Sequence, residues 1–388
     1  MKKTLLLHLL LVVSFIATAQ ITITDSIVSN GIQRQYRLYI PAVYNNTSSP
    51  RPLVIIMHGY TGSAANIQSH TNFMPIADTA NFLMVYPQGT YIPTTTNTYW
   101  NANFYANGVN DIAFIEDLID TLSKQYRIDS TSIFATGFSN GGFMSHTLAC
   151  ALSNKIAAIA SVSGTMADTQ FGSHCQPARA VPVMQIHGTS DATVYYNGGT
   201  NLGINMMAVD SVLQFWISNN KCDTAPLVSN VPDIDTFDNC TAIHYVYGGG
   251  TSGATVELYK IVLGGHTWPG SFPINFWEAT SQDVKASKEI WRFFSANKMV
   301  LPTAVNDVAA RTIAVYPTPA ERVLNFNIGD ENNMELKTIK VANLLGENVK
   351  EFQTNANFFS VEELKAGWYS FSVSISNNQL LVGRFIRK

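Results

Sequence analysis

The sequence is poor in charged residues and has no excess of positive charge. Only 13% of its 388 residues are charged, and 24 basic residues against 27 acidic ones give a net charge of −3. Such a chain has no cationic field for nucleic acid or for an acidic membrane surface, so we expect neither as a partner. The apolar fraction of 46%, with 21 Phe, 16 Tyr and 6 Trp, excludes a disordered chain. The composition indicates a folded, enzyme-sized protein, and its length favours two units of unequal size.

Long hydrophobic runs are scarce as well, except at the N-terminus. Lys2 and Lys3 precede an apolar run over residues 5–16, which is short for a bilayer span and is followed by the small residues Ala17, Thr18 and Ala19. This pattern predicts a signal peptide over residues 1–19, with a retained N-terminal anchor as the alternative. No later stretch reaches about eighteen consecutive apolar residues, so we expect no membrane span in the mature chain and a location outside the cytoplasm.

Cysteine is also sparse. Outside the cytoplasm, an even number of cysteines predicts disulfide bonds, and the four here are Cys150, Cys175, Cys222 and Cys240. Pairing in sequence order, Cys150 with Cys175 and Cys222 with Cys240, is one of three possible connectivities, and four buried thiols are the alternative. The wide spacing is unlike that of zinc or redox sites.

Histidine pairs with the spacing of metal ligands are missing. His70, His146, His174 and His244 form no HxxxH or HExxH pattern. We therefore expect no metal and no cofactor.

Cysteine and histidine are confined to one part of the chain. All four cysteines and seven of the eight histidines lie within residues 21–298, whereas residues 313–388 have neither and carry a higher density of charge. We predict a catalytic domain over residues 20–298, a linker over 299–312 and a small C-terminal domain over 313–388.

Short apolar runs alternate with helical patterns in the larger domain. The runs at 52–57, 82–86, 132–136, 157–162 and 181–186 are typical of strands buried on both faces of a parallel sheet. Residues 111–122 show helical periodicity, and the alternation over 27–40 predicts an antiparallel hairpin at one edge of the sheet. The predicted fold class is α/β, with a doubly wound, mostly parallel sheet.

The strongest chemical signal is a serine between glycines. Ser139 lies in the stretch 137–142, after the strand that ends at Thr136 and before an apolar helical segment. This is the strand–turn–helix context of a nucleophile elbow, in which the hydroxyl projects above the sheet beside a helix N-terminus. The alternative is a tight turn with an idle serine.

A base and a carboxylate follow in the order that this type of fold uses. Asp191 follows the run 181–186, and His266 lies in the glycine-rich segment 264–270. We predict a triad of Ser139, His266 and Asp191, with Asp168 or Asp210 as substitutes if Asp191 is a plain turn residue. The second histidine near the acid, His187, is expected to be structural, because a triad uses one base.

The turn after the strand at 52–57 predicts the oxyanion hole. In such folds one backbone N–H comes from this turn and the other from the residue after the nucleophile, so we assign Tyr60 and Asn140. His58 is expected to position this turn rather than to react.

These residues amount to a family resemblance. The larger domain resembles the polyhydroxybutyrate depolymerase and feruloyl esterase branch of the α/β-hydrolases, which includes carbohydrate esterases similar to family 1. The matching stretches, in order, are 53–59, 86–89, 110–115, 137–142, 186–191 and 264–270. The resemblance implies the same triad. Many polymer depolymerases of the branch have a cysteine-containing turn at the position of Tyr60, so its tyrosine favours a sugar-linked or soluble ester.

The tail resembles the C-terminal sorting domain of the type IX secretion route. The resemblance lies in residues 316–320, 346–349, 364–369 and 385–388, and alternating patterns within it predict a small β-sandwich. It implies secretion machinery as a partner and a secreted or cell-surface location. A carbohydrate-binding or adhesive module is the alternative.

Three functions follow from these predictions. The first is a secreted serine carboxylesterase acting on feruloyl or acetyl esters of plant polysaccharides; the second is a polyester depolymerase or serine peptidase; the third is a noncatalytic binding protein on a hydrolase scaffold. Loop aromatics near the motifs are candidate substrate contacts: Tyr91, Trp100, Tyr105, Tyr196 and Trp268.

Overall fold

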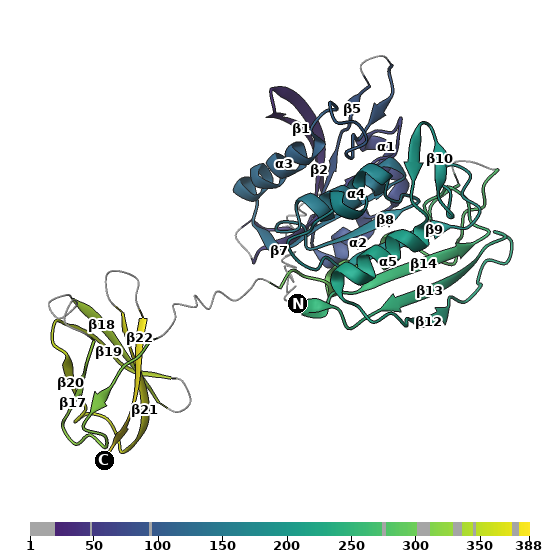
Figure 1. Cartoon of the computed structure of the whole chain (residues 1–388). Helices are drawn as coiled ribbons and strands as arrows, with labels where there is room; N and C mark the ends of the chain where they lie inside the picture. Colours follow the sequence, from purple (N-terminus) through teal and green to yellow (C-terminus); the bar gives the residue numbers. More distant parts are fainter. Residues whose placement is uncertain are drawn as a thin grey trace, which may run out of the picture. The chain divides into compact units, whose positions relative to one another are not determined.

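The computed structural model describes most of the chain after the predicted signal peptide. The described residues are 20–46, 49–92, 95–273, 277–300, 311–328, 336–343, 347–374 and 380–388. The chain divides into two compact units, Met1–Val300 and Leu301–Lys388 (Figure 1). The predicted signal peptide and residues 301–310 of the predicted linker lie outside the described residues, so the predicted domain boundaries stay predictions.

A ten-stranded sheet forms the centre of the first unit. Its strand order is β1-β2-β4-β3-β7-β8-β9-β14-β13-β12. The six central strands β4, β3, β7, β8, β9 and β14 run parallel, and each strand outside them pairs antiparallel with its neighbour. Their bounds are Ile21–Ser29 (β1), Ile32–Ile40 (β2), Arg51–Met57 (β3), Leu83–Pro87 (β4), Ile128–Phe138 (β7), Ala158–Val162 (β8), Val183–Gly188 (β9), Leu227–Asn230 (β12), Thr241–Tyr247 (β13) and Val256–Val262 (β14). The predicted doubly wound, mostly parallel sheet is confirmed, with its hairpin β1–β2 at one edge.

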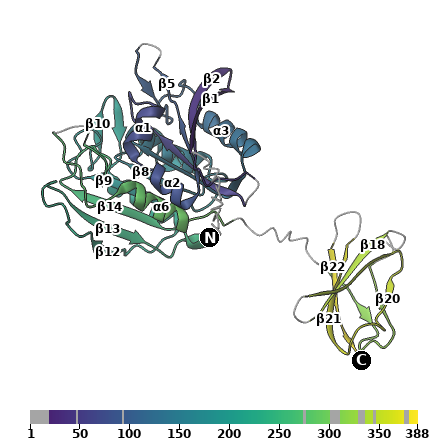
Figure 2. The ribbon, with the colours of Figure 1, turned by 180° about the vertical axis from the view of Figure 1, so that it is seen from behind.

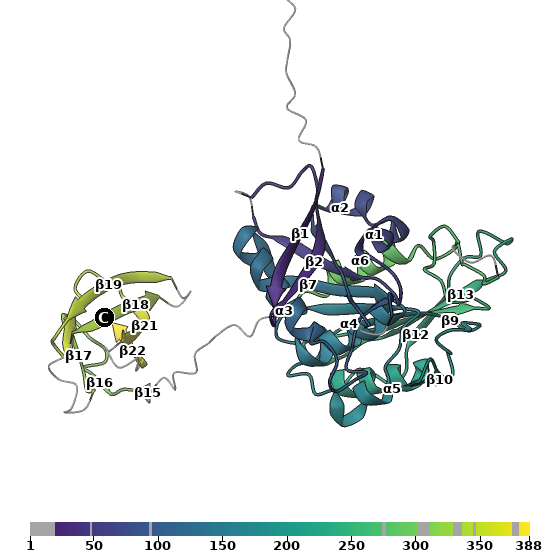
Figure 3. The same ribbon diagram turned by 90° about the horizontal axis from the view of Figure 1, so that it is seen from above.

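Helices cover both faces of this sheet, as the view along its edge shows (Figure 3). One face carries α3 (Asp111–Gln125), α4 (Asn140–Ala151) and α5 (Val209–Asn220), and the other carries α1 (Ala64–Thr71), α2 (Met74–Ala80) and α6 (Ala286–Ala296) (Figures 1 and 2). Successive side chains of a strand point to opposite faces, so Leu53 and Ile55 enter the core under α3–α5, whereas Val54 and Ile56 enter the other core. Among the described residues, no helix combines the length and hydropathy needed to cross a bilayer.

Two small hairpins and two of the three 3-10 turns among the described residues of this unit lie in loops at one edge of the sheet. The hairpins are β5–β6 (Thr90–Tyr91 and Thr98–Tyr99), after β4, and β10–β11 (Gly199–Asn201 and Ile204–Met206), after β9. The turns are η1 (Asp168–Gln170) and η2 (Gly172–His174), after β8. All of them follow the carboxyl ends of parallel strands, the edge where α/β folds place their sites.

The second unit is a β-sandwich, as predicted. One sheet has the order β15-β22-β21-β18-β19 and the other β16-β17-β20. The bounds are Arg311–Thr312 (β15), Val315–Tyr316 (β16), Val323–Phe326 (β17), Lys337–Asn343 (β18), Asn348–Thr354 (β19), Phe358–Ser360 (β20), Gly367–Ser374 (β21) and Leu380–Arg387 (β22). Phe326, Phe359, Phe371 and Phe385 pack against one another in its core, supplying the apolar burial that a small domain needs.

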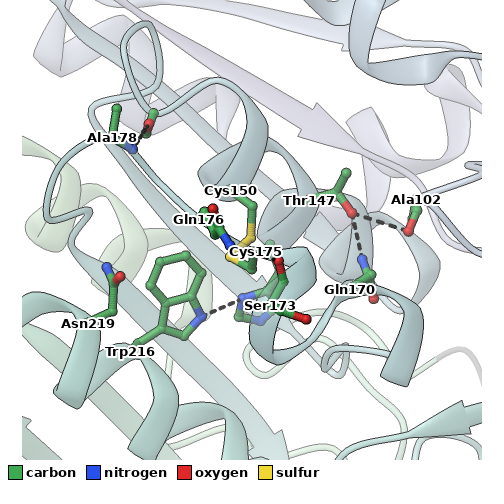
Figure 4. The surroundings of a disulfide bond; sticks show 12 residues. Ala102, Thr147, Cys150, Gln170, Ser173, Cys175, Gln176, Ala178, Trp216 and Asn219 are labelled. Carbon is green, nitrogen blue, oxygen red and sulfur yellow. Dashed lines mark hydrogen bonds between the residues drawn. A yellow bond between two sulfur atoms is a disulfide. The ribbon is translucent and has the colours of Figure 1, made fainter.

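One of the two predicted disulfides is present and the other is not. Cys150, at the end of α4, is bonded to Cys175 (Figure 4). Cys222 and Cys240 are both buried free thiols. The predicted pairing of Cys222 with Cys240 is wrong because Cys222 packs in the core under α3–α5 and Cys240 packs in the core on the other face, with the sheet between them.

Removing the observed disulfide should lower stability. The bond closes a loop with a sequence separation of 25 residues, so Cys150→Ala/Cys175→Ala should lower the free energy of unfolding by about 3 kcal/mol in urea denaturation. Thiol titration of the denatured, unreduced protein should find the two thiols of Cys222 and Cys240. In the control variant Cys222→Ala, reductant should still lower the free energy of unfolding. Four titratable thiols in the unreduced protein would contradict the assigned disulfide, as would a stability that reductant leaves unchanged.

Candidate active site

Ser139 occupies a strained turn between β7 and α4. Its backbone has φ 55° and ψ −120°, a conformation that L-residues rarely adopt. The turn is held by extremely close backbone packing: a Cβ built at Gly141 would lie 2.3 Å from the carbonyl oxygen of Met57, and one built at Gly137 would lie 2.4 Å from the carbonyl oxygen of Gly141. Glycine is therefore required on both sides of the serine, as in a nucleophile elbow.

Asp191 and His266 form a hydrogen-bonded pair. The imidazole Nδ1 of His266 lies 2.8 Å from Oδ2 of Asp191, and the carboxylate is fully buried. The other carboxylate oxygen accepts hydrogen bonds from the backbone N–H groups of Thr193 at 2.9 Å and Val194 at 2.7 Å. With both oxygens occupied, the carboxylate holds the imidazole in a fixed orientation.

The pKa of Asp191 is held well below its ordinary value. Burial alone would raise this pKa, but the hydrogen bonds from His187 and His266 outweigh burial. The group therefore stays ionised at neutral pH, as the orienting acid of a triad must.

Backbone hydrogen bonds join the loops that carry Asp191 and His266. The amide of Thr189 donates to the carbonyl of Ile261, and the amide of Ser190 donates to the carbonyl of Gly264. Glu278 adds a carboxylate oxygen that accepts from the backbone N–H of His266 at 3.1 Å. These bonds connect the ends of β9 and β14, which are neighbours in the sheet.

The predicted oxyanion turn lies next to the nucleophile. A Cβ built at Gly59 would lie 3.2 Å from Cβ of Ser139. The carbonyl of Gly59 accepts from the amide of Gly62 at 3.0 Å and lies 2.7 Å from Nδ1 of His58. Since C=O and N–H point in opposite directions across one peptide group, these bonds turn the N–H of Tyr60 away from His58.

His58 is built to hold this turn. Its Nε2 accepts from the backbone N–H of Gly89 at 2.9 Å, which leaves Nδ1 to carry the proton and donate to Gly59. Burial, reinforced by the positive charge of Arg34, lowers the pKa of His58 to about 4, although the bond to Gly59 opposes the shift.

Trp100 braces Asn140, the second predicted oxyanion residue. Its backbone N–H and C=O make hydrogen bonds of 2.7 and 3.0 Å with the side-chain amide of Asn140, and its indole donates to the carbonyl of His58 at 2.9 Å. Because Asn140 begins α4, its own backbone N–H is among those that the helix leaves unpaired.

An apolar cavity of about 520 Å³ opens over Ser139 and His266. It lies within the range of ~300–1,000 Å³ that is usual for small-molecule sites. Most of its wall is apolar, and α4 and the hairpin β10–β11 both contribute: Ile67, Ile92, Phe104, Phe138, Phe143, Val194, Leu202, Ile204 and Met206. His70, Tyr60, Tyr99 and Tyr105 add polar groups.

Four of the five predicted aromatic contacts do not line this cavity. Tyr105 does; Tyr91 is exposed outside it, and Trp100, Tyr196 and Trp268 are buried. Tyr196 donates its hydroxyl hydrogen bond to Asp210, and the indole of Trp268 donates to Ser287 in the core on the far face. As substrate contacts, these buried residues are wrong predictions, because their polar atoms already have protein partners. The alternating residues Ile204 and Met206, which do line the cavity, lie in a strand too short to be recognised from its sequence.

The comparisons with known proteins agree with the resemblance stated above. Residues 38–209 match the family described as Phospholipase/Carboxylesterase, and residues 314–388 match the secretion system C-terminal sorting domain. The predicted resemblance to esterases of the feruloyl esterase branch, joined to a sorting domain, is confirmed. The sorting domain indicates export or a cell-surface location.

Three curated relatives show how far the similarity extends. A bifunctional acetylxylan esterase/xylanase from Neocallimastix patriciarum is 28% identical over 263 residues, which are 67% of this chain and 35% of that protein. Feruloyl esterase B from Piromyces equi is 29% identical over 223 residues, 55% of this chain and 39% of that protein. Feruloyl esterase C from Emericella nidulans is 28% identical over 251 residues, 62% of this chain and 86% of that protein. The chain thus spans little more than a third of the length of the first two.

The packing at the elbow predicts the effect of one added methyl group. Gly141→Ala should lower the free energy of unfolding by about 1–3 kcal/mol, because the new Cβ forces the backbone of α4 away from β3. Urea denaturation measures this change. Gly248→Ala is the matched control, since a Cβ there meets nothing within 4 Å. Equal stability of the two variants would show that the elbow is less tightly packed than described.

Proposed function

We propose that the first unit of this α/β-hydrolase is a serine carboxylesterase, with Ser139 as nucleophile, His266 as base and Asp191 as the acid that orients it. The observation that carries the proposal is the 2.8 Å pair of His266 and Asp191, with His266 lining the same cavity as a serine in elbow geometry. With Nδ1 bonded to Asp191, the proton acceptor of His266 is Nε2.

The reaction then follows from these positions. Ser139 Oγ attacks the ester carbonyl, and its proton passes to Nε2 of His266, which then gives it to the leaving alcohol. The N–H groups of Tyr60 and Asn140 stabilise the oxyanion, each by about 3 kcal/mol as for such donors in other hydrolases. Water, activated by the same histidine, attacks the acyl-enzyme and releases the carboxylic acid.

The substrate that we propose is an ester on a plant polysaccharide, with a feruloyl group preferred over an acetyl group. The relatives include enzymes named feruloyl esterase and acetylxylan esterase. The size and apolar wall of the cavity favour the larger aromatic acyl group, because an acetyl group would bury little of that wall. Phe104 and Phe143, which pack edge to face in this wall, suit an aromatic ring.

For the second unit, we propose the role of an export address. The match of residues 314–388 to sorting domains and the predicted signal peptide over residues 1–19 together support passage out of the cell, with the type IX secretion machinery as the partner. In this proposal the catalytic domain occupies residues 20–298, the linker 299–312 and the sorting domain 313–388. The catalytic residues all lie in the first unit.

Ser139→Ala should abolish ester hydrolysis while leaving the fold intact. The expected loss in kcat is roughly 10⁶-fold, as for removal of the nucleophile in other serine hydrolases. Turnover of a chromogenic aryl ester measures it, and Ser69→Ala, in the exposed part of α1, is the control. Substantial residual activity would overturn the role of Ser139, and an inactive wild-type protein would favour a noncatalytic binding function.

A bulkier side chain in the cavity wall should lower activity on a feruloyl ester more than activity on an acetyl ester. Ile204→Trp adds bulk to the wall at β11, so kcat/KM for methyl ferulate should fall about tenfold or more, while that for an aryl acetate should change little. Ile234→Trp, at a residue that is 79% exposed and outside the cavity, is the control. Parallel losses on both esters would show that this wall does not contact the acyl group.

A further inference from the structure

A chain of buried polar side chains runs through the core to the carboxylate of Asp191. It starts on α5, passes α4 and ends on β9, and each of its members is 0–1% exposed. Its links are Trp216 Nε1 to His146 Nδ1 at 3.1 Å, His146 Nε2 to Gln185 Oε1 at 3.3 Å, Gln185 Nε2 to His187 Nδ1 at 3.0 Å, and His187 Nε2 to the carbonyl of Val194 at 2.8 Å and to Asp191 Oδ2 at 3.4 Å.

The first link fixes the proton of His146. An indole N–H only donates, so Nδ1 of His146 has to accept from Trp216. The imidazole is then neutral with its proton on Nε2, and it donates to Gln185 Oε1. Burial also favours the neutral ring and lowers the pKa of His146 to about 4, although the bond to Gln185 opposes this shift. Trp216 is visible beside the Cys150–Cys175 disulfide, with its indole hydrogen bond drawn as a dashed line (Figure 4).

A second anchor fixes the amide of Gln185. Its nitrogen lies 2.6 Å from the carbonyl oxygen of Gly164, which only accepts, so this end of the amide has to be the NH₂ group. The second hydrogen of that group points to Nδ1 of His187, which therefore accepts. A flipped amide would place two oxygen atoms against each other at Gly164.

The proton of His187 is then fixed on Nε2. That N–H faces two oxygen atoms, the carbonyl of Val194 and Oδ2 of Asp191, the same carboxylate oxygen that binds His266. With the opposite tautomer, the lone pair of Nε2 would face both oxygens and repel the carboxylate. Each group of the chain thus donates to the next one toward Asp191, and this donor-to-acceptor direction suits an ionised carboxylate.

We propose that the chain Trp216–His146–Gln185–His187 positions Asp191, the acid of the triad, and that His187 is the member of the chain that contacts it. His187 is a positioning residue: it places an N–H beside Asp191 and leaves the imidazole of His266 as the base. The chain also connects α4, whose N-terminus follows Ser139, to the loop of Asp191. One set of hydrogen bonds therefore fixes the position of α4 relative to Asp191.

The direction of the chain can be measured without any substrate. In the full-length protein labelled with ¹⁵N-histidine, nitrogen–proton correlation spectra at pH 7 should show His146 and His187 neutral, each with its proton on Nε2. Single His→Gln variants assign the signals. A proton on Nδ1, or on both nitrogens, in either residue would overturn the proposal.

A pair of variants tests the effect on catalysis, which rests on the proposed esterase function. His187→Gln retains an N–H donor near the position of Nε2, whereas His187→Leu removes it. We expect kcat on an aryl ester to fall about tenfold or more in the leucine variant, with KM little changed, and most of kcat to be restored in the glutamine variant. His174→Leu, an exposed histidine outside the chain, is the control.

The two measurements separate the two proposals. Equal losses in the leucine and glutamine variants would show that His187 acts only by filling space, and would overturn the positioning role. If the wild-type protein hydrolyses no ester but shows the predicted tautomers, the esterase function fails while the assigned direction of the chain stands.

Discussion

The site depends on the contact between the backbone of the elbow and its neighbouring strands. Gly141 lies so close to the end of β3 that no side chain fits there, and Gly137 in turn lies against Gly141. This contact keeps Ser139 at positive φ, where its strain of about 1–3 kcal/mol is offset by the surrounding packing. It also brings the turn of Gly59 and Tyr60 beside the nucleophile, because that turn continues from the same strand. The positions of the proposed oxyanion donors and of the proposed nucleophile therefore follow from one packing arrangement.

Polar side chains buried under α3–α5 serve the site from two sides. On one side, the buried pair of Arg34 and Asp111 holds the segment before α3: Asp111 accepts from the backbone N–H of Asn101, next to Trp100, at 2.7 Å. On the other side, the chain ending at His187 holds the acid. A buried charge or amide without partners would cost several kcal/mol, so such groups are tolerated in a core only when they are fully paired. Here the paired groups also fix the directions in which the groups of the site point.

The sequence alone predicted the sheet, the elbow and the acid and base that the structure brings together, because each lies in a local pattern. A strand, a turn and a helix around Ser139 are readable over a few residues, and Asp191 and His266 follow strands that end at one edge of the sheet. The pairing of Cys222 with Cys240 and the roles of Trp100, Tyr196 and Trp268 depend on which face of the sheet a residue meets, and that is decided by contacts distant in the sequence. The chain from Trp216 to His187 was missed for the same reason, since its members come from three separate elements.

In the proposed esterase, catalysis and selectivity depend on different parts of the chain. Ser139, Asp191 and His266 follow central strands and are fixed by glycine contacts, backbone bonds between loops and buried polar groups. Part of the cavity wall comes instead from the short hairpin β10–β11, which is attached through the bond from the amide of Met207 to the carbonyl of Met166 and through the bridge between Ala167 and Met206. A substitution at Ile204 or Met206 of the hairpin changes the shape of the cavity without removing a hydrogen bond of Asp191 or His266. Related enzymes that hydrolyse esters of different acyl groups can therefore share one arrangement of catalytic residues. Substrate selectivity is the property that changes most readily in such a fold.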